Sequence, residues 1–232
     1  QMWQMIPPQV VAEPAVAELA PARPNFAGYA EGWSLSDFRG RRLVWHTGGW
    51  PGMVSRVTLV PGENLGVVVL TNQEAGAAFN AITLSVLDAY LGGDRHDWVD
   101  AYGKAVDKSR DKADAAWAKH QAARTAHTTP SLALERYAGR YRDRWYGDMH
   151  ITGNGKALRL RFDKTAQLVG TLEHWQHDTF IVRWDDRSLN ADAFVNFSLD
   201  PDGKVREVRM QAISELTDFS FDFQDLLFVP QG

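Results

Sequence analysis

The chain of 232 residues has 44% hydrophobic and 23% charged residues, an ordinary composition for a globular protein of one or two domains. Its formal net charge of −4 gives no reason to expect general attraction to nucleic acid or to an anionic membrane surface. No apolar run approaches the about 20 residues that span a bilayer. The chain has no cysteine, which excludes disulfides and thiol chemistry.

The first third of the chain predicts a loop followed by an antiparallel β-meander. Residues 1–25 contain five of the ten prolines, which favours a loop over a helix. We expect strands at 29–36, 41–46, 53–60 and 65–72, with a turn at 37–40. The last two strands flank Pro61-Gly62-Glu63-Asn64, a turn sequence because proline presets φ and glycine tolerates a positive φ.

Two helices are predicted after the meander. Residues 75–91 place apolar side chains at helical spacing, and Gly92-Gly93 ends the pattern. Residues 97–126 are rich in charge and carry a thin apolar stripe, which predicts an amphipathic connecting helix. We expect a domain boundary near Thr128-Thr129-Pro130.

The rest of the chain predicts an all-β domain. Short strands are expected at 139–142, 148–151, 157–162, 167–172, 179–183, 193–199 and 205–210. Turn sequences such as Gly153-Asn154-Gly155 and Asp200-Pro201-Asp202-Gly203 separate them. Regular short strands with turns between them are typical of a sandwich or a small barrel.

The second strand of the meander is followed by the tract His46-Thr47-Gly48-Gly49. Glycine at a strand edge removes the Cβ that would keep a substrate away from the backbone. With Gly32-Trp33, Pro51-Gly52 and Leu70-Thr71-Asn72, the tract resembles the third active-site motif of the serine β-lactamase, penicillin-binding protein and esterase superfamily, in particular its class C β-lactamase and esterase type.

That resemblance implies roles for four residues. The backbone N–H of Gly49 would be an oxyanion donor, His46 would line and polarise the pocket, and Thr47 and Gly48 would bind substrate. The family often has lysine where this chain has His46, and a neutral imidazole is a poor anchor for a carboxylate. The resemblance therefore favours an esterase, amidase or peptidase-like member. The alternative is a surface histidine in a hairpin turn.

The residues that would attack the substrate are not evident in the chain. Ser109-x-x-Lys112 matches the family's nucleophile motif, but it lies in a highly charged helix and follows the third motif instead of preceding it. Ser188-x-Asn190 is misplaced in the same way. The start, with Met2-Trp3 and Pro7-Pro8-Gln9, resembles the stretch that precedes the meander in that family. We therefore expect the C-terminal part of a longer hydrolase, inactive on its own.

The all-β region carries a second resemblance. Leu134-x-x-Tyr137-Ala138-Gly139-x-Tyr141 and residues 172–180 resemble the lipocalin-like β-barrel domain that often follows serine β-lactamase-like hydrolase domains. His174 and His177 are interpreted as turn histidines, so no metal is expected, and no cofactor motif is present. The aromatic tracts at 143–146 and 175–184 are either barrel core and rim or the lining of a ligand-binding barrel mouth.

The sequence thus predicts an α+β chain with three parts. These are a partial β-lactamase-like domain at 1–93, formed by the antiparallel meander and its C-terminal helix, a helical connector at 94–130, and a small antiparallel lipocalin-like barrel at 131–232. The meander is apolar on both faces and the helix at 75–91 can cover only one. We therefore expect the N-terminal half of the same hydrolase, or a second copy, to pack on residues 28–72.

The predicted function is acyl transfer to serine followed by hydrolysis of an amide or ester bond. The substrate would be a small molecule or a peptide, with no cofactor and no nucleic acid. The alternative is a non-catalytic barrel that binds a ligand or peptide or regulates a neighbour. By resemblance the parent protein is periplasmic or secreted, although no signal peptide opens this chain.

Overall fold

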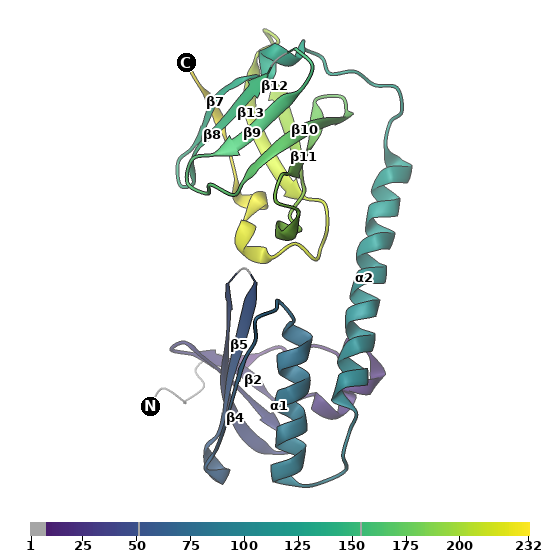
Figure 1. Cartoon of the computed structure of the whole chain (residues 1–232), viewed down its shortest axis with the longest axis vertical. Helices are drawn as coiled ribbons and strands as arrows, with labels where there is room; N and C mark the ends of the chain where they lie inside the picture. The colour runs from purple at the N-terminus through teal and green to yellow at the C-terminus, as the bar shows by residue number, and fades with distance from the viewer. Residues whose placement is uncertain (1–7, 51, 154) are drawn as a thin grey trace. The chain divides into compact units, whose positions relative to one another are not determined.

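The computed structural model describes residues 8–50, 52–153 and 155–232 and divides the chain into two compact units (Figure 1). Unit 1 lies within residues 1–110 and unit 2 within residues 111–232. Each unit has its own antiparallel sheet and its own hydrophobic core. The start of the chain, including the Met-Trp stretch that resembles the family, lies outside the described residues.

Unit 1 is a six-stranded antiparallel meander in which each strand pairs with its neighbours in sequence. Its strands are β1 (Pro8–Gln9), β2 (Ala27–Ala30), β3 (Trp33–Phe38), β4 (Arg41–Trp50), β5 (Met53–Val60) and β6 (Leu65–Leu70). The predicted turn before β6 is a short 3-10 segment, η2 (Pro61–Glu63), that ends with Asn64 in the left-handed region. The predicted meander is therefore confirmed.

One predicted strand is wrong. The stretch 29–36 is split between β2 and β3 by a tight turn at Glu31 and Gly32, where φ is +48° and +82°. Positive φ at two successive residues suits the twist of a two-residue hairpin. The Glu-Gly pair carries this signal, which the apparent alternation of the surrounding residues concealed.

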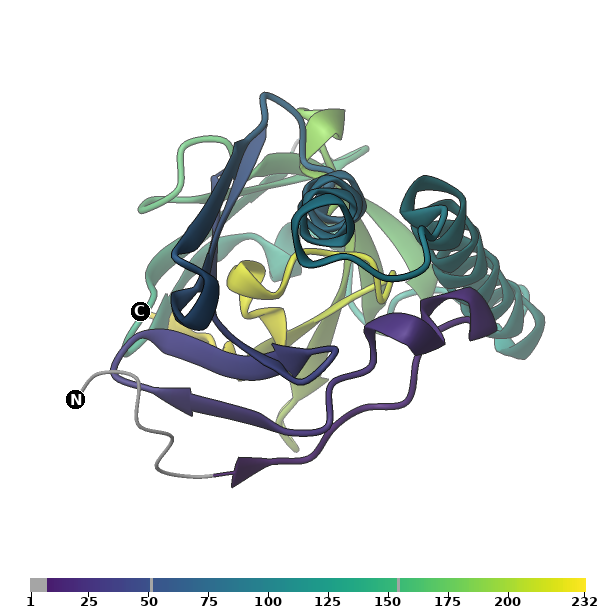
Figure 2. The same ribbon diagram turned by 90° about the horizontal axis from the view of Figure 1, so that it is seen from below.

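Helix α1 (Gly76–Leu91) lies along one face of the sheet (Figure 2). Side chains alternate along each strand, so Val60 and Val67 point toward the helix and pack with Leu84 and Leu87. On the opposite face Val68 is 65% exposed and Leu70 is 77% exposed. The helix therefore covers one face of the meander only.

Helix α2 (Trp98–Ala123) confirms the helix predicted at 97–126. Trp98 and Ala101, at its start, are buried in unit 1. The Trp98 indole N–H donates to Asp88 at 2.8 Å, which ties the start of α2 to α1. Within unit 2, the Trp117 ring contacts that of Trp175 at 5.3 Å. Neither α-helix of the described chain is long and apolar enough to cross a membrane.

Unit 2 is an eight-stranded antiparallel sheet in the order β13-β12-β11-β10-β9-β8-β7-β14. Its strands are β7 (Gly139–Asp143), β8 (Gly147–Gly153), β9 (Leu158–Phe162), β10 (Val169–Gln176), β11 (Thr179–Trp184), β12 (Ala193–Leu199), β13 (Val205–Ala212) and β14 (Val229–Gln231). A bridge between Val208 and Phe228 brings the two ends of this sheet together, so it is nearly closed and barrel-like.

The interior of unit 2 is filled by large side chains. Tyr137, Phe180, Trp184 and Phe228 are each at most 1% exposed. The rings of Tyr137, Phe180 and Phe197 pack edge to face, which is a favoured aromatic geometry. The inward-facing residues of this sheet thus form a packed core, as expected for a small barrel.

Candidate active-site wall

Strand β4, which carries the His-Thr-Gly-Gly tract, extends beyond its neighbour β3. The pairing of β3 with β4 runs from Phe38–Arg41 to Ser34–Trp45, whereas the pairing of β5 with β4 continues to Trp50–Met53. Residues 46–50 therefore have a strand partner on one side only among the described strands. The other side is a free backbone edge.

The register shows which backbone groups point to this free edge. In an antiparallel strand, the N–H and C=O of one residue point to the same side. Thr71 N–H donates to Val54 C=O at 3.0 Å, and Val54 N–H donates to the Thr71 hydroxyl at 3.3 Å. The backbone of Val54 thus points away from β4. Gly49 is its register partner, so the N–H and C=O of Gly49 point away from β5, toward the free edge.

The same alternation directs the backbone of Thr47 to the free edge, where His46 binds it. His46 Nδ1 lies 2.6 Å from the Thr47 carbonyl oxygen. A carbonyl only accepts, so Nδ1 carries the proton, and Nε2 of the neutral ring accepts from the Tyr29 hydroxyl at 3.3 Å. His46 is exposed, and its tautomer is set by these two contacts.

The two glycines of the tract differ in what a side chain would meet. A Cβ on Gly48 would lie 2.8 Å from the Ser55 hydroxyl oxygen, so Gly48 allows close contact with β5. A Cβ on Gly49 would meet only Val54 Cγ1, at 3.9 Å. Gly49 is exposed and leaves the strand edge bare, although its local packing would tolerate alanine.

A half-buried arginine supports the tract from the helix-covered face. Arg56 is the register partner of Thr47, and its guanidinium lies 4.3 Å from the Trp45 ring centre. It donates to the Thr58 hydroxyl at 2.9 Å and to the Asn80 side chain of α1. Burial lowers the pKa of Arg56 to about 10, so it stays charged at neutral pH. The sequence interpretation missed this residue, although an arginine within an apolar strand was a visible signal.

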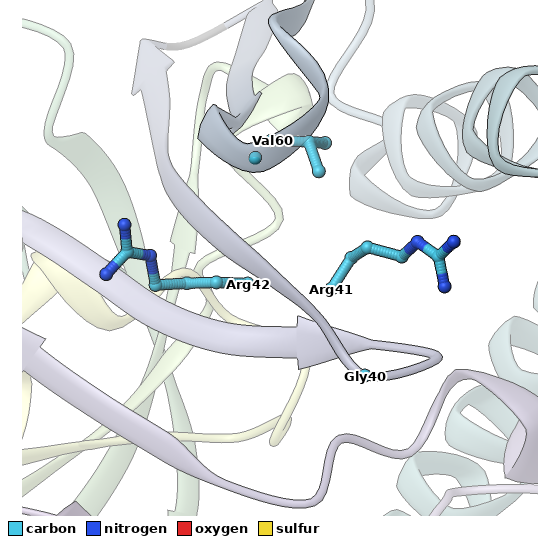
Figure 3. Close-up of a pocket in the computed structure, with 5 residues that line it drawn as sticks. Gly40, Arg41, Arg42 and Val60 are labelled. Carbon is cyan, nitrogen blue, oxygen red and sulfur yellow. The ribbon is translucent and has the colours of Figure 1, made fainter.

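Neither of the two pockets described in the chain includes residues 46–49. A pocket of about 370 Å³ lies at the other end of β4, lined by Gly40, Arg41, Arg42, Val60 and Gly62. Figure 3 shows Arg41 and Arg42 pointing to opposite sides of the strand. The His-Thr-Gly-Gly tract is therefore an open wall within this chain.

The misplaced serine motifs lie where no nucleophile is activated. The Ser109 hydroxyl donates to the carbonyl of Ala105 within α2. The Lys112 side chain is 72% exposed and pairs with Glu215 at 2.6 Å, so it lies in solvent and not beside a serine in a desolvated pocket. Ser188 donates to Asp186 in a 3-10 turn. These contacts agree with the prediction that neither serine is the nucleophile.

Two sets of side chains in unit 2 contain residue types that bind metals. His174 lies in strand β10, opposite Phe180, so its predicted place in a turn is wrong, whereas His177 does lie in the β10–β11 turn. The His174 Nε2 donates to the His177 carbonyl at 2.9 Å. Ligand atoms of Asp148, His150 and Asp163 do lie within 4.8 Å of one another, a group that the sequence interpretation missed. Residues 148 and 150 share a face of β8, which was the available signal.

Arginines already neutralise this group. Arg142 pairs with Asp148 at 2.6 Å and Arg140 at 2.7 Å, and Arg161 pairs with Asp163 at 2.6 Å. Hydrogen bonds from Arg142 and then Arg140 hold the pKa of Asp148 at about 2. Fixed cations beside both carboxylates oppose binding of a divalent ion.

Comparison with known proteins assigns each part of the chain. Residues 8–90 match the family model described as Beta-lactamase, and residues 123–230 match one described as a domain of unknown function, DUF3471. A curated relative, the Unguisins hydrolase ungD' of Aspergillus campestris (strain IBT 28561), is 26% identical over 192 residues. The match covers 76% of this chain and 35% of the relative, so the chain spans about a third of that protein's length.

Solved structures give weaker matches. The crystal structure of SurE has a TM-score of 0.35 and 14% identity, and it is matched over 88% of this chain and 37% of its own. The octameric penicillin-binding protein homologue from Pyrococcus abyssi has a TM-score of 0.29 and 18% identity. The match covers 82% of this chain and 36% of that protein's chain. Both scores are too low to establish a common overall fold.

The residues that match the Beta-lactamase family model include the free, glycine-bearing edge of β4 and the meander. This match and the hydrolase relative confirm the resemblance of the chain to β-lactamase-like and penicillin-binding-protein-like serine hydrolases. Residues 123–230, which match the model of unknown function, include the strands of the nearly closed, barrel-like antiparallel sheet.

Proposed function

We propose that this chain is the C-terminal part of a serine hydrolase that cleaves amide or ester bonds by acyl transfer. It supplies one wall of the active site, and the rest of the hydrolase supplies the nucleophilic serine and its base. The observation that carries the proposal is the free edge of β4 beyond Trp45, to which the N–H of Gly49 is directed.

Each residue of the tract has a role in this proposal. The Gly49 N–H donates to the oxyanion that forms when the serine attacks the substrate carbonyl. Thr47 and Gly48 contact the substrate beside it. The His46 ring, which contacts Thr47 and Tyr29, shapes the pocket wall without anchoring a carboxylate. A small-molecule or peptide ester or amide is the substrate class that fits such a wall.

The exposed apolar face of the meander supports the proposal that the N-terminal part of the hydrolase packs on it. Trp50 is 74% exposed, Met53 53%, Val68 65% and Leu70 77%, all on the face that α1 does not cover. Wet apolar surface of this kind typically marks an interface. We assign it to the N-terminal part of the same hydrolase, with a second copy of this chain as the alternative occupant.

Unit 2 is proposed to be a lipocalin-like appended domain of this hydrolase. An alternative role as a ligand-binding barrel is disfavoured because buried side chains such as Tyr137, Phe180 and Trp184 fill its interior. A binding role for unit 2 would therefore use its outer surface. By family resemblance the parent protein is proposed to be periplasmic or secreted.

Turnover of nitrocefin and p-nitrophenyl acetate tests the proposed function. We expect no turnover by this chain alone and turnover when the N-terminal part of the hydrolase is added. Gly49→Pro removes the N–H that points to the free edge and should abolish turnover, whereas Gly49→Ala keeps the N–H and should retain it. Turnover by the chain alone would show that the nucleophile lies within these 232 residues.

A further inference from the structure

The strands β7, β8 and β9 of unit 2 form a basic surface in an otherwise acidic chain. Residues 139–164 contain seven basic and three acidic residues, a net charge of +4, while the whole chain has −4. Tyr141, Met149 and Leu160 point into the core, so the residues that alternate with them face outward. The outward set includes Arg140, Arg142, His150, Arg159 and Arg161.

A rigid turn at the end of this surface presents a tryptophan to solvent. The buried Asp143 carboxylate accepts the N–H of Trp145 at 2.7 Å, of Tyr146 at 2.9 Å and of Leu227 at 2.9 Å. The Tyr146 hydroxyl donates to Asp222. The turn is thus fixed on both sides, yet the Trp145 side chain is 87% exposed.

Beside Trp145 lies a pocket of about 350 Å³, within the usual size range of small-ligand sites. It is lined by Arg142, Asp143, Arg144, Trp145, Gly147, Asp148, Asp163 and Lys164. The aliphatic chain of Lys164 passes over Gly147, whose φ is +89°, with Cγ 3.3 Å from the position of a Cβ. A glycine at 147 therefore lets Lys164 lie along the pocket.

Two basic side chains of this pocket form no ion pair with the described residues. Asp148 pairs with Arg140 and Arg142, and Asp163 pairs with His150 and Arg161. The oxygens of Asp143 are used by backbone N–H groups. In contrast, neither Arg144 nor Lys164 has a carboxylate within 4.0 Å among the described residues.

We propose that this pocket binds a carboxylate carried by a short peptide. Arg144 and Lys164 pair with the carboxylate, and the indole of Trp145 packs on the apolar side chain next to it. Charge-assisted bonds from arginine and contacts of an exposed tryptophan are the features that dominate binding at small interfaces. This proposal rests on unit 2 alone and does not depend on the proposed hydrolase activity.

Asp148 and Asp163 in the pocket wall disfavour long polyanions as ligands. A long polyanion such as nucleic acid would be repelled by Asp148 and Asp163 at the pocket wall. A peptide carboxylate is a single charge with N–H donors on either side. Carboxylate oxygens have several lone pairs, so Asp148 and Asp163 can accept those donors while they pair with arginines.

Titrations of the full chain, followed by NMR of the Trp145 indole N–H, test the proposal. Trp145→Phe assigns the signal. The three probes are acetyl-Phe-Glu-Phe-amide, acetyl-Phe-Gln-Phe with a free C-terminal carboxylate, and the neutral acetyl-Phe-Gln-Phe-amide. We expect at least one carboxylate peptide to shift the indole signal and to bind about tenfold more tightly than the neutral peptide. The two acidic probes distinguish a side-chain from a terminal carboxylate.

Charge-removing variants locate the site. Arg144→Gln and Lys164→Gln should each weaken binding about fivefold, and glutamine keeps the aliphatic stem over Gly147. Arg206→Gln, an exposed change on β13 in the same unit, is the matched control and should leave the affinity unchanged. Equal binding of the neutral peptide, an unshifted indole signal, or unchanged affinity in both variants overturns the proposal. Tighter binding of inorganic phosphate than of either acidic peptide also overturns it, because the site would then be a general anion site.

Discussion

The two sheets of the molecule differ in whether their edges and apolar faces are covered. The sheet of unit 2 curls until β13 and the segment before β14 meet, and it buries its apolar side chains inside. The sheet of unit 1 stays open, with a free backbone edge at 46–50 and apolar side chains in water at Val68 and Leu70. Exposed edges and apolar faces are usually covered in native proteins. Unit 1 is therefore the part on which we propose that other polypeptide packs.

The largest expected effect is a loss of unfolding free energy, which we compare for one apolar residue from each sheet. Phe180 is 1% exposed in unit 2, and Phe180→Ala should destabilise that unit by about 3–5 kcal/mol. Leu70 is 77% exposed in unit 1, so Leu70→Ala should change stability by no more than about 0.5 kcal/mol. Denaturant unfolding, with a separate probe for each unit, gives both values. A large loss from Leu70→Ala in the chain alone would show that this face is already covered.

A smaller effect is expected at the arginine beneath the tract. Arg56→Met keeps much of the side-chain length but removes the donors to Thr58 and Asn80 and the contact of the cation with Trp45. Leaving such buried acceptors without a partner costs about 1–3 kcal/mol. The unfolding transition of unit 1 should shift, and that of unit 2 should not.

The matched control for Arg56 is Arg41→Met at the start of β4. Arg41 forms an exposed pair with Glu63 at 3.1 Å, and exposed pairs contribute at most about 1 kcal/mol. If the two variants lose equal stability, Arg56 contributes no more than a surface ion pair does, and its support of the tract must be abandoned.

Amide hydrogen exchange sharpens the contrast between the two sheets at single residues. The N–H groups of Thr47 and Gly49 point to the free edge, and those of His46 and Gly48 point to β5. We expect the first pair to exchange at least about tenfold faster than the second. In β12, which has strands on both sides, residues such as Val195 and Asn196 should both be protected. Uniform protection across 46–49 would mean that the edge is covered.

Much of the fold could be predicted because local signals agree with the final structure. The apolar runs at 57–60 and 67–70 and the turn at 61–64 place β5 and β6 within two residues. The Gly92-Gly93 pair follows the last residue of α1, and both glycines have positive φ. Seven of the eight strands of unit 2 were likewise predicted from apolar residues between turns.

What could not be predicted depends on contacts between distant residues. β14 is three residues long and contains Pro230, and it forms only because Val229 reaches Arg142 of β7. A glycine-bearing strand edge at 46–49 was expected from the resemblance, but the pairing that leaves it free could not be predicted. That edge exists because β4 extends beyond the last residue of β4 that pairs with β3. The direction of the Gly49 N–H follows from the hydrogen bonds between Val54 and Thr71. The proposed roles of the tract stay predictions.

The smallest expected effect is a difference in tautomer between one histidine of each unit, which involves no change in stability. His46 bonds the Thr47 carbonyl through Nδ1, and His174 bonds the His177 carbonyl through Nε2. Each bond places the proton on the nitrogen that faces the carbonyl, so the two neutral rings should be opposite tautomers. Side-chain ¹H–¹⁵N NMR at about pH 8.5, well above the ordinary imidazole pKa of about 6.5, distinguishes them.

Tyr29→Phe is the control for His46, because it removes the 3.3 Å contact with Nε2 and leaves the bond to Thr47 in place. The His46 tautomer should therefore be unchanged in this variant. A proton on Nε2 of His46 in the unmodified chain would contradict the structure at this edge. The Thr47 carbonyl would then be open to solvent beside the Gly49 N–H, and the edge would offer substrate an acceptor as well as a donor.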